Sequence, residues 1–196
     1  MAIALVRPAV PDDAPAVTVV QREVWTTAWA DFLPAGITEG FDDEAVSAAW
    51  ERAAAGPGLW VATEGSEVVG FCLAGPAPEE DVADAVGEVP DDAAAVGLVA
   101  TLLVAPRWGR RGHGGRLLVT AAEALGSGGA TRGITWVPER DASSRAFYGR
   151  AGWDPDGTVR TLDAGGRPLR EVRLGGPLDL EFAPEPSAAD LGLPLL

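Results

Sequence analysis

The chain has 196 residues, of which 47% are hydrophobic and 22% are charged, and its formal net charge is −14. This composition fits one compact domain with a buried core, and the acidic balance disfavours nucleic acid as a partner, because phosphate binding needs a basic surface. A single cysteine, Cys72, excludes a disulfide framework within the chain, and a single histidine, His113, argues against a zinc cluster or a Ser-His-Asp triad.

Every apolar run is shorter than the ~18 residues of a membrane-spanning helix, and the first residues lack the layout of a signal peptide. We therefore expect a soluble, cytoplasmic protein with no membrane partner. All basic side chains are arginine, and the sequence contains neither lysine nor asparagine. We attribute this to composition bias, so a position where asparagine is usual can carry a substitute.

Apolar periodicity and turn residues define the elements of the first half of the chain. In chain order we expect a strand over 3–7, a helix capped by Asp12 or Asp13 and reaching about Ala30, a helix capped by Asp42 or Asp43 and reaching Ala53, and a hairpin of strands 59–63 and 68–74. Residues 75–94 then form an acidic segment without a basic residue. We expect a solvated, partly mobile loop there, with electrostatic attraction of a cationic acceptor as the alternative role.

The second half begins with Val96–Val104, an almost wholly apolar run that predicts a central buried strand. After it we expect a loop over 106–112, a helix over 114–125, a strand over 133–137, a helix over 142–151 capped by Asp141, and a hairpin of strands 157–162 and 168–174. This order predicts a single α/β (α+β) domain over residues 1–174, with a mixed sheet and helices on both faces. Residues 175–196 are expected to form an extended or disordered tail.

The segment Arg110-Arg111-Gly112-His113-Gly114-Gly115 lies between the central strand and a helix, an arrangement that suits phosphate binding. Glycines let successive backbone N–H groups turn toward one ligand. The start of the helix adds unpaired N–H donors and partial positive charge, and the two arginines add full charge. The Gly-Lys-Ser/Thr ending of a Walker loop and the G-x-G-x-x-G spacing of a dinucleotide-binding fold are both absent. The residues therefore predict a phosphate-binding loop outside these two classes.

The longer segment from Leu102 to Leu118 resembles the acyl-CoA-binding motif of the GNAT superfamily of N-acetyltransferases. That motif consists of an apolar strand ending in Val-x-Pro, a basic Q/R-x-x-G-x-G/A loop, and a helix with paired leucines. Gly112 and Gly114 match the loop glycines. Gly109 stands where the family has Gln or Arg, and the two arginines after it are expected to compensate.

A second segment, from Asp141 to Trp153, resembles the family's N-x-x-A-x-x-F-Y-E-x-x-G-F motif, with Asp141 in place of the asparagine and Tyr148 at the tyrosine beside the CoA sulfur. The resemblance covers roughly residues 3–174 and implies a mostly antiparallel central sheet that is splayed at the cofactor site. It also implies acetyl-CoA as cosubstrate and no metal. The cofactor-binding residues that it implies are Leu102, Leu103, Val104, Arg110, Arg111, Gly112, His113, Gly114, Gly115, Asp141, Ser144 and Tyr148.

The chemistry that the resemblance implies is direct attack of a primary amine on the thioester. An amine of pKa ~10.4 must first lose a proton, and a backbone N–H near Val104 would stabilise the oxyanion. Tyr148 is the candidate acid for the departing thiolate, and packing under the sheet is its alternative role. The general base stays unassigned, because many relatives have Glu where this chain has Leu98. Substitutes would be a water chain or one of five carboxylates that also fit caps or surface charges, namely Glu23, Asp31, Glu39, Asp42 and Glu44.

Trp25 and Trp29 lie four residues apart on the first predicted helix and fit either core packing or the lining of an acceptor pocket. His113 fits a structural role better than a catalytic one. The acceptor is expected to be a small amine or a peptide, and the acidic balance weakly favours a cationic one. The sequence leaves open whether the protein forms a homodimer. The competing function is a noncatalytic acyl-CoA-binding or regulatory module, which Leu98 favours and Tyr148 disfavours.

Overall fold

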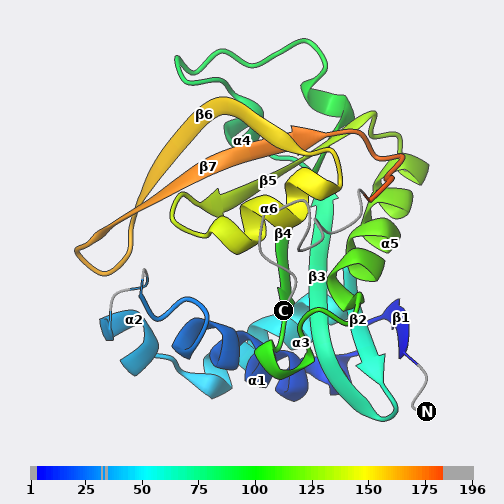
Figure 1. Cartoon of the computed structure of the whole chain (residues 1–196), viewed down its shortest axis with the longest axis vertical. Helices are drawn as coiled ribbons and strands as arrows, with labels where there is room; N and C mark the ends of the chain where they lie inside the picture. The colour runs from blue at the N-terminus through cyan, green and yellow to red at the C-terminus, as the bar shows by residue number, and fades with distance from the viewer. Residues whose placement is uncertain (1–3, 32, 34, 183–196) are drawn as a thin grey trace, which may run out of the picture.

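The computed structural model describes residues 4–31, 33 and 35–182. Its sheet has seven strands in the order β1-β2-β3-β4-β5-β7-β6 (Figure 1). The strands are β1 (Ala4–Pro8), β2 (Leu59–Glu64), β3 (Glu67–Pro76), β4 (Val96–Val104), β5 (Arg132–Pro138), β6 (Asp154–Asp163) and β7 (Pro168–Gly176). The helices are α1 (Ala14–Thr26), α2 (Ala35–Glu39), α3 (Asp43–Ala54), α4 (Glu79–Val82), α5 (His113–Ser127) and α6 (Ala142–Arg150). Neighbouring strands are antiparallel except β4 and β5, which are parallel, so the predicted mixed and mostly antiparallel sheet is confirmed.

Helices cover both faces of the sheet, as predicted (Figure 1). α5 and α6 pack on one face, where Leu117 and Tyr148 share a buried cluster with Val69 of β3. α1 packs on the opposite face, where Val17 shares a second buried cluster with Phe71 of β3. Burial of each large aliphatic or aromatic side chain contributes about 1.5–3 kcal/mol, and these two clusters therefore hold the helices against the sheet.

The central strand β4 is paired over different lengths on its two sides. It is bonded to β3 as far as Val104. It pairs with β5 only from Val96 to Val99, opposite Arg132–Thr135. Beyond that point β5 continues beside β7 alone. The two central strands therefore separate after Val99 and Thr135, which confirms the splayed sheet that the family resemblance implies.

A β-bulge marks the point of separation. The register between β3 and β4 skips Ala100, which is therefore an extra residue on β4. A bulge bends a strand, increases its twist and shifts the alternation of its side chains by one. Accordingly Val99 and Leu102 both lie in the cluster under α5, whereas Leu103 lies in the cluster under α1.

The first helix is shorter than predicted, because α1 ends at Thr26 rather than near Ala30. The hydroxyl groups of Thr26 and Thr27 donate to the carbonyl oxygens of Arg22 and Glu23, respectively. Such side-chain bonds compete with the helical pattern and favour a turn. The chain turns there, and this turn carries Trp29 away from the helix axis.

The acidic caps behave differently at the first two long helices. The Asp42 carboxylate accepts hydrogen bonds from the N–H groups of Glu44 and Ala45, so the predicted cap of α3 is confirmed. Asp13 stands before α1 but makes no side-chain cap bond. Its carboxylate is held instead by the Arg7 guanidinium at 2.7 and 2.8 Å, which lowers the pKa of Asp13.

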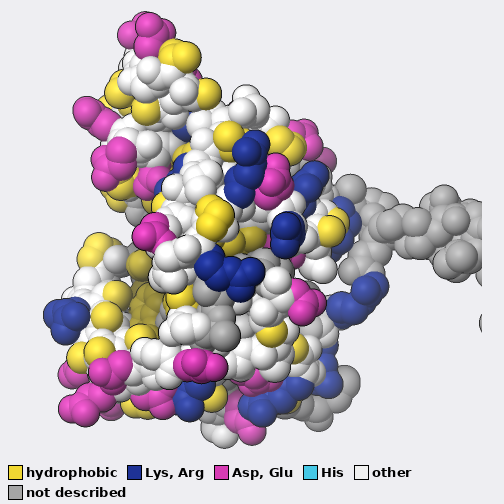
Figure 2. Space-filling view, turned by 90° about the vertical axis from the view of Figure 1, so that its left-hand side faces the viewer, with side chains coloured by type: hydrophobic (Ala, Val, Ile, Leu, Met, Phe, Trp, Pro, Cys, Tyr) yellow, Lys and Arg dark blue, Asp and Glu magenta, His cyan; other side chains and the backbone are white. Residues whose placement is uncertain are grey.

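The acidic segment 75–94 contains more regular structure than a solvated loop. β3 continues to Pro76, and the short helix α4 buries Val82 against the far half of the sheet. The outer part of the segment projects from the top of the molecule, with carboxylate side chains on its surface (Figure 2). The bidentate pair between Arg132 and Asp92, with N–O distances of 2.7 and 3.0 Å, ties its end to β5.

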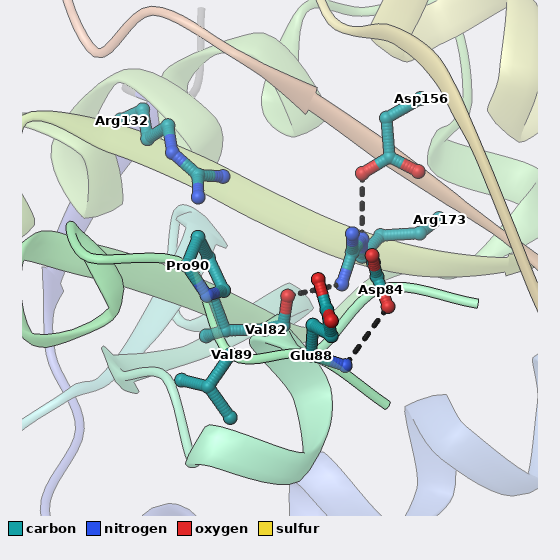
Figure 3. A pocket seen from close by; sticks show the side chains of 8 residues that line it. All are labelled: Val82, Asp84, Glu88, Val89, Pro90, Arg132, Asp156 and Arg173. Atoms are coloured by element: carbon teal, nitrogen blue, oxygen red, sulfur yellow. Dashed lines mark hydrogen bonds and ion pairs between the residues drawn. The ribbon is translucent and has the colours of Figure 1, made fainter. Parts of the chain in front are cut away.

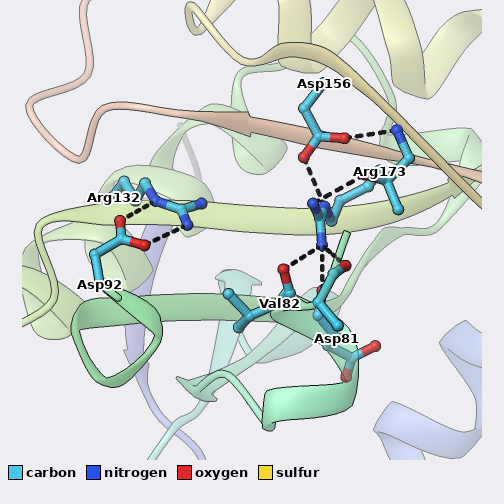
Figure 4. Close-up of polar contacts among 8 residues, drawn as sticks. Asp81, Val82, Asp92, Arg132, Asp156 and Arg173 are labelled. Carbon is cyan, nitrogen blue, oxygen red and sulfur yellow. Dashed lines mark hydrogen bonds and ion pairs between the residues drawn. The ribbon is translucent and has the colours of Figure 1, made fainter. Parts of the chain in front are cut away.

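Arg173 of β7 anchors this segment from inside the fold (Figures 3 and 4). Its Nη1 donates to the three carbonyl oxygens of residues 81–83 at 2.7–2.8 Å. Its Nε donates to Asp156 at 2.6 Å and its Nη2 to Thr158 at 2.9 Å. A cavity of about 350 Å³ opens beside it. Because all three guanidinium nitrogens are engaged, we assign Arg173 to the structure rather than to a ligand.

The last strand ends later than predicted. β7 continues to Gly176, and Leu178, Leu180 and Phe182 pack against the cluster under α5. The expected first residue of the first strand, Ile3, and the remainder of the expected tail, 183–196, lie outside the described residues. Within the described part of the chain, no helix is long and apolar enough to cross a membrane.

We predict that Arg173→Met lowers the free energy of unfolding by about 3–5 kcal/mol, because the carbonyl oxygens of residues 81–83 lose their donor and Asp156 loses the cation that neutralises it. The matched control is Arg132→Met, which breaks a surface pair of the same segment and should cost about 0–1 kcal/mol. Urea denaturation of both variants measures the difference. Equal costs for the two variants would show that Arg173 is not the anchor.

Candidate functional site

The glycine–arginine loop connects the end of β4 to the start of α5. Gly112 is the N-cap of α5 with φ 79°, and Arg110 has φ 59°. This left-handed conformation is costly for a residue with a side chain and typical of functional loops. The N–H groups of Gly112–Gly115 have no helical acceptor, since the first bond of α5 runs from the Arg116 N–H to the Gly112 oxygen. The backbone thus has the geometry that an anion cradle needs.

His113 is buried beneath this loop, with 1% of its surface exposed. Its Nδ1 lies 3.2 Å from an Arg116 nitrogen, and its Nε2 lies 3.0 Å from an oxygen of Glu64 at the end of β2. Arginine can only donate, so Nδ1 is the acceptor and Nε2 carries the hydrogen that Glu64 receives. The imidazole therefore has a structural role, and the backbone N–H of His113 is the group of this residue that has no helical acceptor.

Two arginines, Arg111 and Arg116, contact the loop and its surroundings in different ways. Arg111 donates to Glu64 at 3.3 Å and lies over the Trp108 ring at 4.7 Å. Arg116 donates to the Arg111 carbonyl oxygen at 3.2 Å, and its guanidinium lies next to Gly112. Neither Arg116 nor Glu64 was among the residues predicted for this site. Arg116 directly follows Gly115, so its place next to the loop could have been predicted from the sequence. No local pattern marks Glu64 as the partner of His113.

The separated part of β4 forms one wall beside the loop. Leu102 and Val104 are half-buried on the side of α5, and Leu103 is buried on the opposite side. Past Val99 the β4 edge that faces β5 has no partner strand in the described chain. Its backbone groups can therefore pair with an extended ligand in the way that they would pair with a strand.

Tyr148 lies at the inner end of the split. Its ring stacks on Trp153 with 5.6 Å between centroids, and burial, partly opposed by a hydrogen bond with Thr135, raises the pKa of the phenol. The Thr135 hydroxyl itself donates to the Val99 oxygen at 2.8 Å. Val99 and Thr135 are the last paired residues of β4 and β5. The phenol is therefore held, in its protonated form, where the two strands part.

Asp141 and Ser144 hold the start of α6, the helix that carries Tyr148. The Asp141 carboxylate accepts from the Ser144 N–H at 2.9 Å and from its hydroxyl at 2.6 Å, which confirms the predicted cap. The same carboxylate accepts from the Trp29 indole at 3.2 Å. These side chains bind one another, so a contact with a cofactor would come through their backbone or their positioning effect.

The two tryptophans of the predicted first helix have separate partners. Trp29, in the turn after α1, reaches across to Asp141 and so links the α1 side of the molecule to α6. Trp25 packs edge-on against Phe41 with 5.5 Å between centroids. Both are half-buried against the cluster under α1.

The carboxylates considered as a general base are scattered. Asp42 is occupied as a helix cap, whereas Asp31 lines a cavity of about 490 Å³ between the α1–α2 connection, the end of β5 and the β6–β7 hairpin. Leu98, at the position where many relatives have Glu, packs against Val82 and Ile134. The structure therefore places an apolar side chain at the usual position of the base.

The segment after β7 also borders the site, which the prediction of a tail did not include. The Phe182 ring lies 5.7 Å from the Phe147 ring of α6 and beside Gly115 of the loop. Leu178 lies near Gly133 of β5 and Gly126 of α5. The segment therefore runs past α5 toward the helix start and adds an aromatic side chain next to the loop.

The sequence profile of the acetyltransferase (GNAT) family matches residues 22–153. The match includes the glycine–arginine loop, the split strands and Tyr148, and the chain belongs to this family. Comparison with curated proteins yields no sequence match.

Solved structures of acetyltransferases share the fold. The PaiA N-acetyltransferase from Thermoplasma acidophilum, in complex with coenzyme A, has 14% identity and a TM-score of 0.67 over 89% of this chain and 99% of its own. YncA from Salmonella typhimurium, with its cofactor acetyl-CoA, has 18% identity and a TM-score of 0.65 over 93% and 98%. The ribosomal-protein-alanine N-acetyltransferase from Brucella melitensis has 19% identity and a TM-score of 0.64 over 88% and 99%.

We predict that Glu64→Ala lowers the free energy of unfolding by about 1–3 kcal/mol, because the buried His113 loses its acceptor. Glu67→Ala is the control. It lies on the same hairpin, and its 3.6 Å pair with Arg107 is exposed, so the expected cost is about 0–1 kcal/mol. Chemical denaturation of the two variants decides the point, and a Glu64→Ala protein as stable as the control would refute the role of the His113–Glu64 bond.

Proposed function

We propose that this protein transfers the acetyl group of acetyl-CoA to a primary amine by direct attack of the amine on the thioester. The observation that carries the proposal is the split between β4 and β5, which has the loop of α5 at one end and the phenol of Tyr148 at the other. Membership in the acetyltransferase family supports the transfer of an acetyl group. The choice of an amine and the direct attack are our inference.

The described residues fit the parts of an acyl-CoA molecule. A pyrophosphate needs several donors, and the free N–H groups of Gly112–Gly115 with Arg110 and Arg116 supply them. A pantetheine arm is extended and carries amide groups. It matches the unpaired edge of β4 beyond Val99, next to the apolar side chains of Leu102 and Val104. Acetyl-CoA, when bound, supplies the activated acyl group.

The chain itself would contribute orientation, an electrostatic site and a proton. Backbone N–H groups of β4 near Val104 would stabilise the negative charge that develops on the carbonyl oxygen. Tyr148 stays protonated through neutral pH, because burial raises its pKa, and it would donate that proton to the departing thiolate. We assign no general base. Among the five candidate carboxylates, Asp31 is one that lines a cavity.

A noncatalytic acyl-CoA-binding module is the second candidate, and one observation favours it. Leu98 is a partly buried apolar side chain packed against other apolar side chains, so the position of the usual base cannot accept a proton. Such a module would bind acetyl-CoA and release no thiol with any amine.

The test follows thiol release from acetyl-CoA with a panel of amines, alongside the calorimetric affinity for acetyl-CoA. Cys72 is buried and its pKa is raised, so the protein's own thiol adds little to the signal. We expect thiol release, and we expect Tyr148→Phe to lower turnover by about 10²-fold or more while the affinity for acetyl-CoA stays unchanged. Unchanged turnover would refute the role of Tyr148, and binding without thiol release from any amine would favour the module.

A further inference from the structure

The cavity of about 490 Å³ lies at the open end of the split. Its walls are Asp31 and Leu33 after α1, residues 138–140 at the end of β5, and parts of the β6–β7 hairpin. β5 is one arm of the split, and Pro138 lies three residues past its last pair with β4. The volume is that of a pocket for a small molecule, which typically measures about 300–1,000 Å³. An acceptor in this cleft would lie against the end of β5, one of the two separated strands.

More basic than acidic side chains line the cleft, although the protein as a whole is acidic. Three arginines line it, Arg140, Arg167 and Arg170, against two carboxylates, Asp31 and Glu139, in a chain of net charge −14. Figure 2 looks onto this side of the molecule and shows arginine side chains (dark blue) gathered in the middle of the face, next to a hollow.

The arginines of the cleft are available to a ligand. Within the described residues, neither Arg140 nor Arg167 has an ion pair or a side-chain hydrogen bond. Arg170 is bonded to Glu139 at 3.1 Å, but 54% and 45% of these two side chains are exposed. An exposed pair of this kind contributes little to stability, so Arg170 can exchange Glu139 for a ligand at low cost.

The backbone under these side chains is held in place. Arg140 directly precedes Asp141, whose carboxylate is bonded to Ser144 and to Trp29. Arg167 lies in the turn of the hairpin, where its carbonyl oxygen accepts from the Ala164 N–H at 2.8 Å. The two guanidinium groups therefore extend from fixed positions on two walls of one cleft.

Resting on the proposed function, we infer that the acceptor is a small primary amine that carries a carboxylate, and that Arg140 and Arg167 bind this carboxylate. A guanidinium forms paired, charge-assisted bonds with a carboxylate, and these are among the strongest polar contacts in proteins. Asp31, on the α1–α2 wall, supplies the opposite charge for the ammonium group before it loses its proton. The cationic acceptor that the net charge of the whole chain suggested is thus replaced by a zwitterionic one.

The test compares three pairs of amines that differ only in the carboxylate, with acetyl-CoA as donor. They are phenylalanine and 2-phenylethylamine, methionine and 3-(methylthio)propylamine, and β-alanine and ethylamine. We expect kcat/KM to be at least about tenfold higher for the carboxylate member of one pair or more. In the double variant Arg140→Gln/Arg167→Gln, this advantage should fall by about 10- to 100-fold, mainly through KM, with the other member unaffected. Arg52→Gln is the control, because Arg52 is an exposed arginine of α3 outside the cleft and should behave as the wild type.

The outcomes separate this inference from the proposed function. Thiol release without preference for the carboxylate, or a preference that survives in the double variant, overturns the inference and leaves the acetyltransferase activity intact. Absence of thiol release with every amine overturns the proposed function. Calorimetric titration with the same amines then decides on the cleft. Binding of a carboxylate member that is lost in the double variant supports the inference, and absence of such binding overturns it.

Discussion

The loss of pairing between β4 and β5 after Val99 and Thr135 is the constraint on which the rest of the site depends. Adjacent parallel strands normally satisfy each other's backbone groups along their length, and an unpaired inner edge costs free energy unless a ligand or water replaces the lost partner. Here the extra residue Ala100 turns β4 away from β5. The same bulge moves Leu102 and Val104 to the face of α5, so the released edge comes with apolar side chains on the side of the phosphate loop.

Each element around the split then follows from local chemistry. The left-handed conformations of Arg110 and Gly112 turn the chain into the start of α5, whose first N–H groups have no helical acceptor. The carboxylate of Asp141 fixes α6 and, through it, the position of Tyr148. Because arginine is the only basic residue in the chain, one residue type serves opposite purposes. A buried arginine with every nitrogen bonded holds the acidic segment. Two exposed arginines of the cleft that we propose for the acceptor, Arg140 and Arg167, have no side-chain partner among the described residues.

Much of this architecture could be predicted from the sequence, because its signals are local. The uninterrupted apolar run of Val96–Val104 identified the central strand, and the caps at Asp42 and Asp141 were found at the correct helices. The end of α1 was misplaced, since apolar spacing continues past Thr26 while two threonine hydroxyls already favour a turn.

Other features depend on contacts between distant residues, which no periodicity reveals. They include the bond between His113 and Glu64, the packing of Phe182 beside the loop, and the gathering of three arginines from two segments at one cleft. The arginines illustrate the limit best, because the net charge of the whole chain suggested the opposite sign for this surface.

The central claim is that coenzyme A lies in the split, with its pyrophosphate at the start of α5. Hydrogen–deuterium exchange with and without saturating coenzyme A measures this directly, because exchange reports on the amide groups themselves. The account predicts slower exchange in peptides that cover residues 101–104 and 110–116, and unchanged exchange in the acidic segment 79–92. Binding of coenzyme A that leaves 101–104 and 110–116 unprotected, or that protects the acidic segment instead, would contradict it.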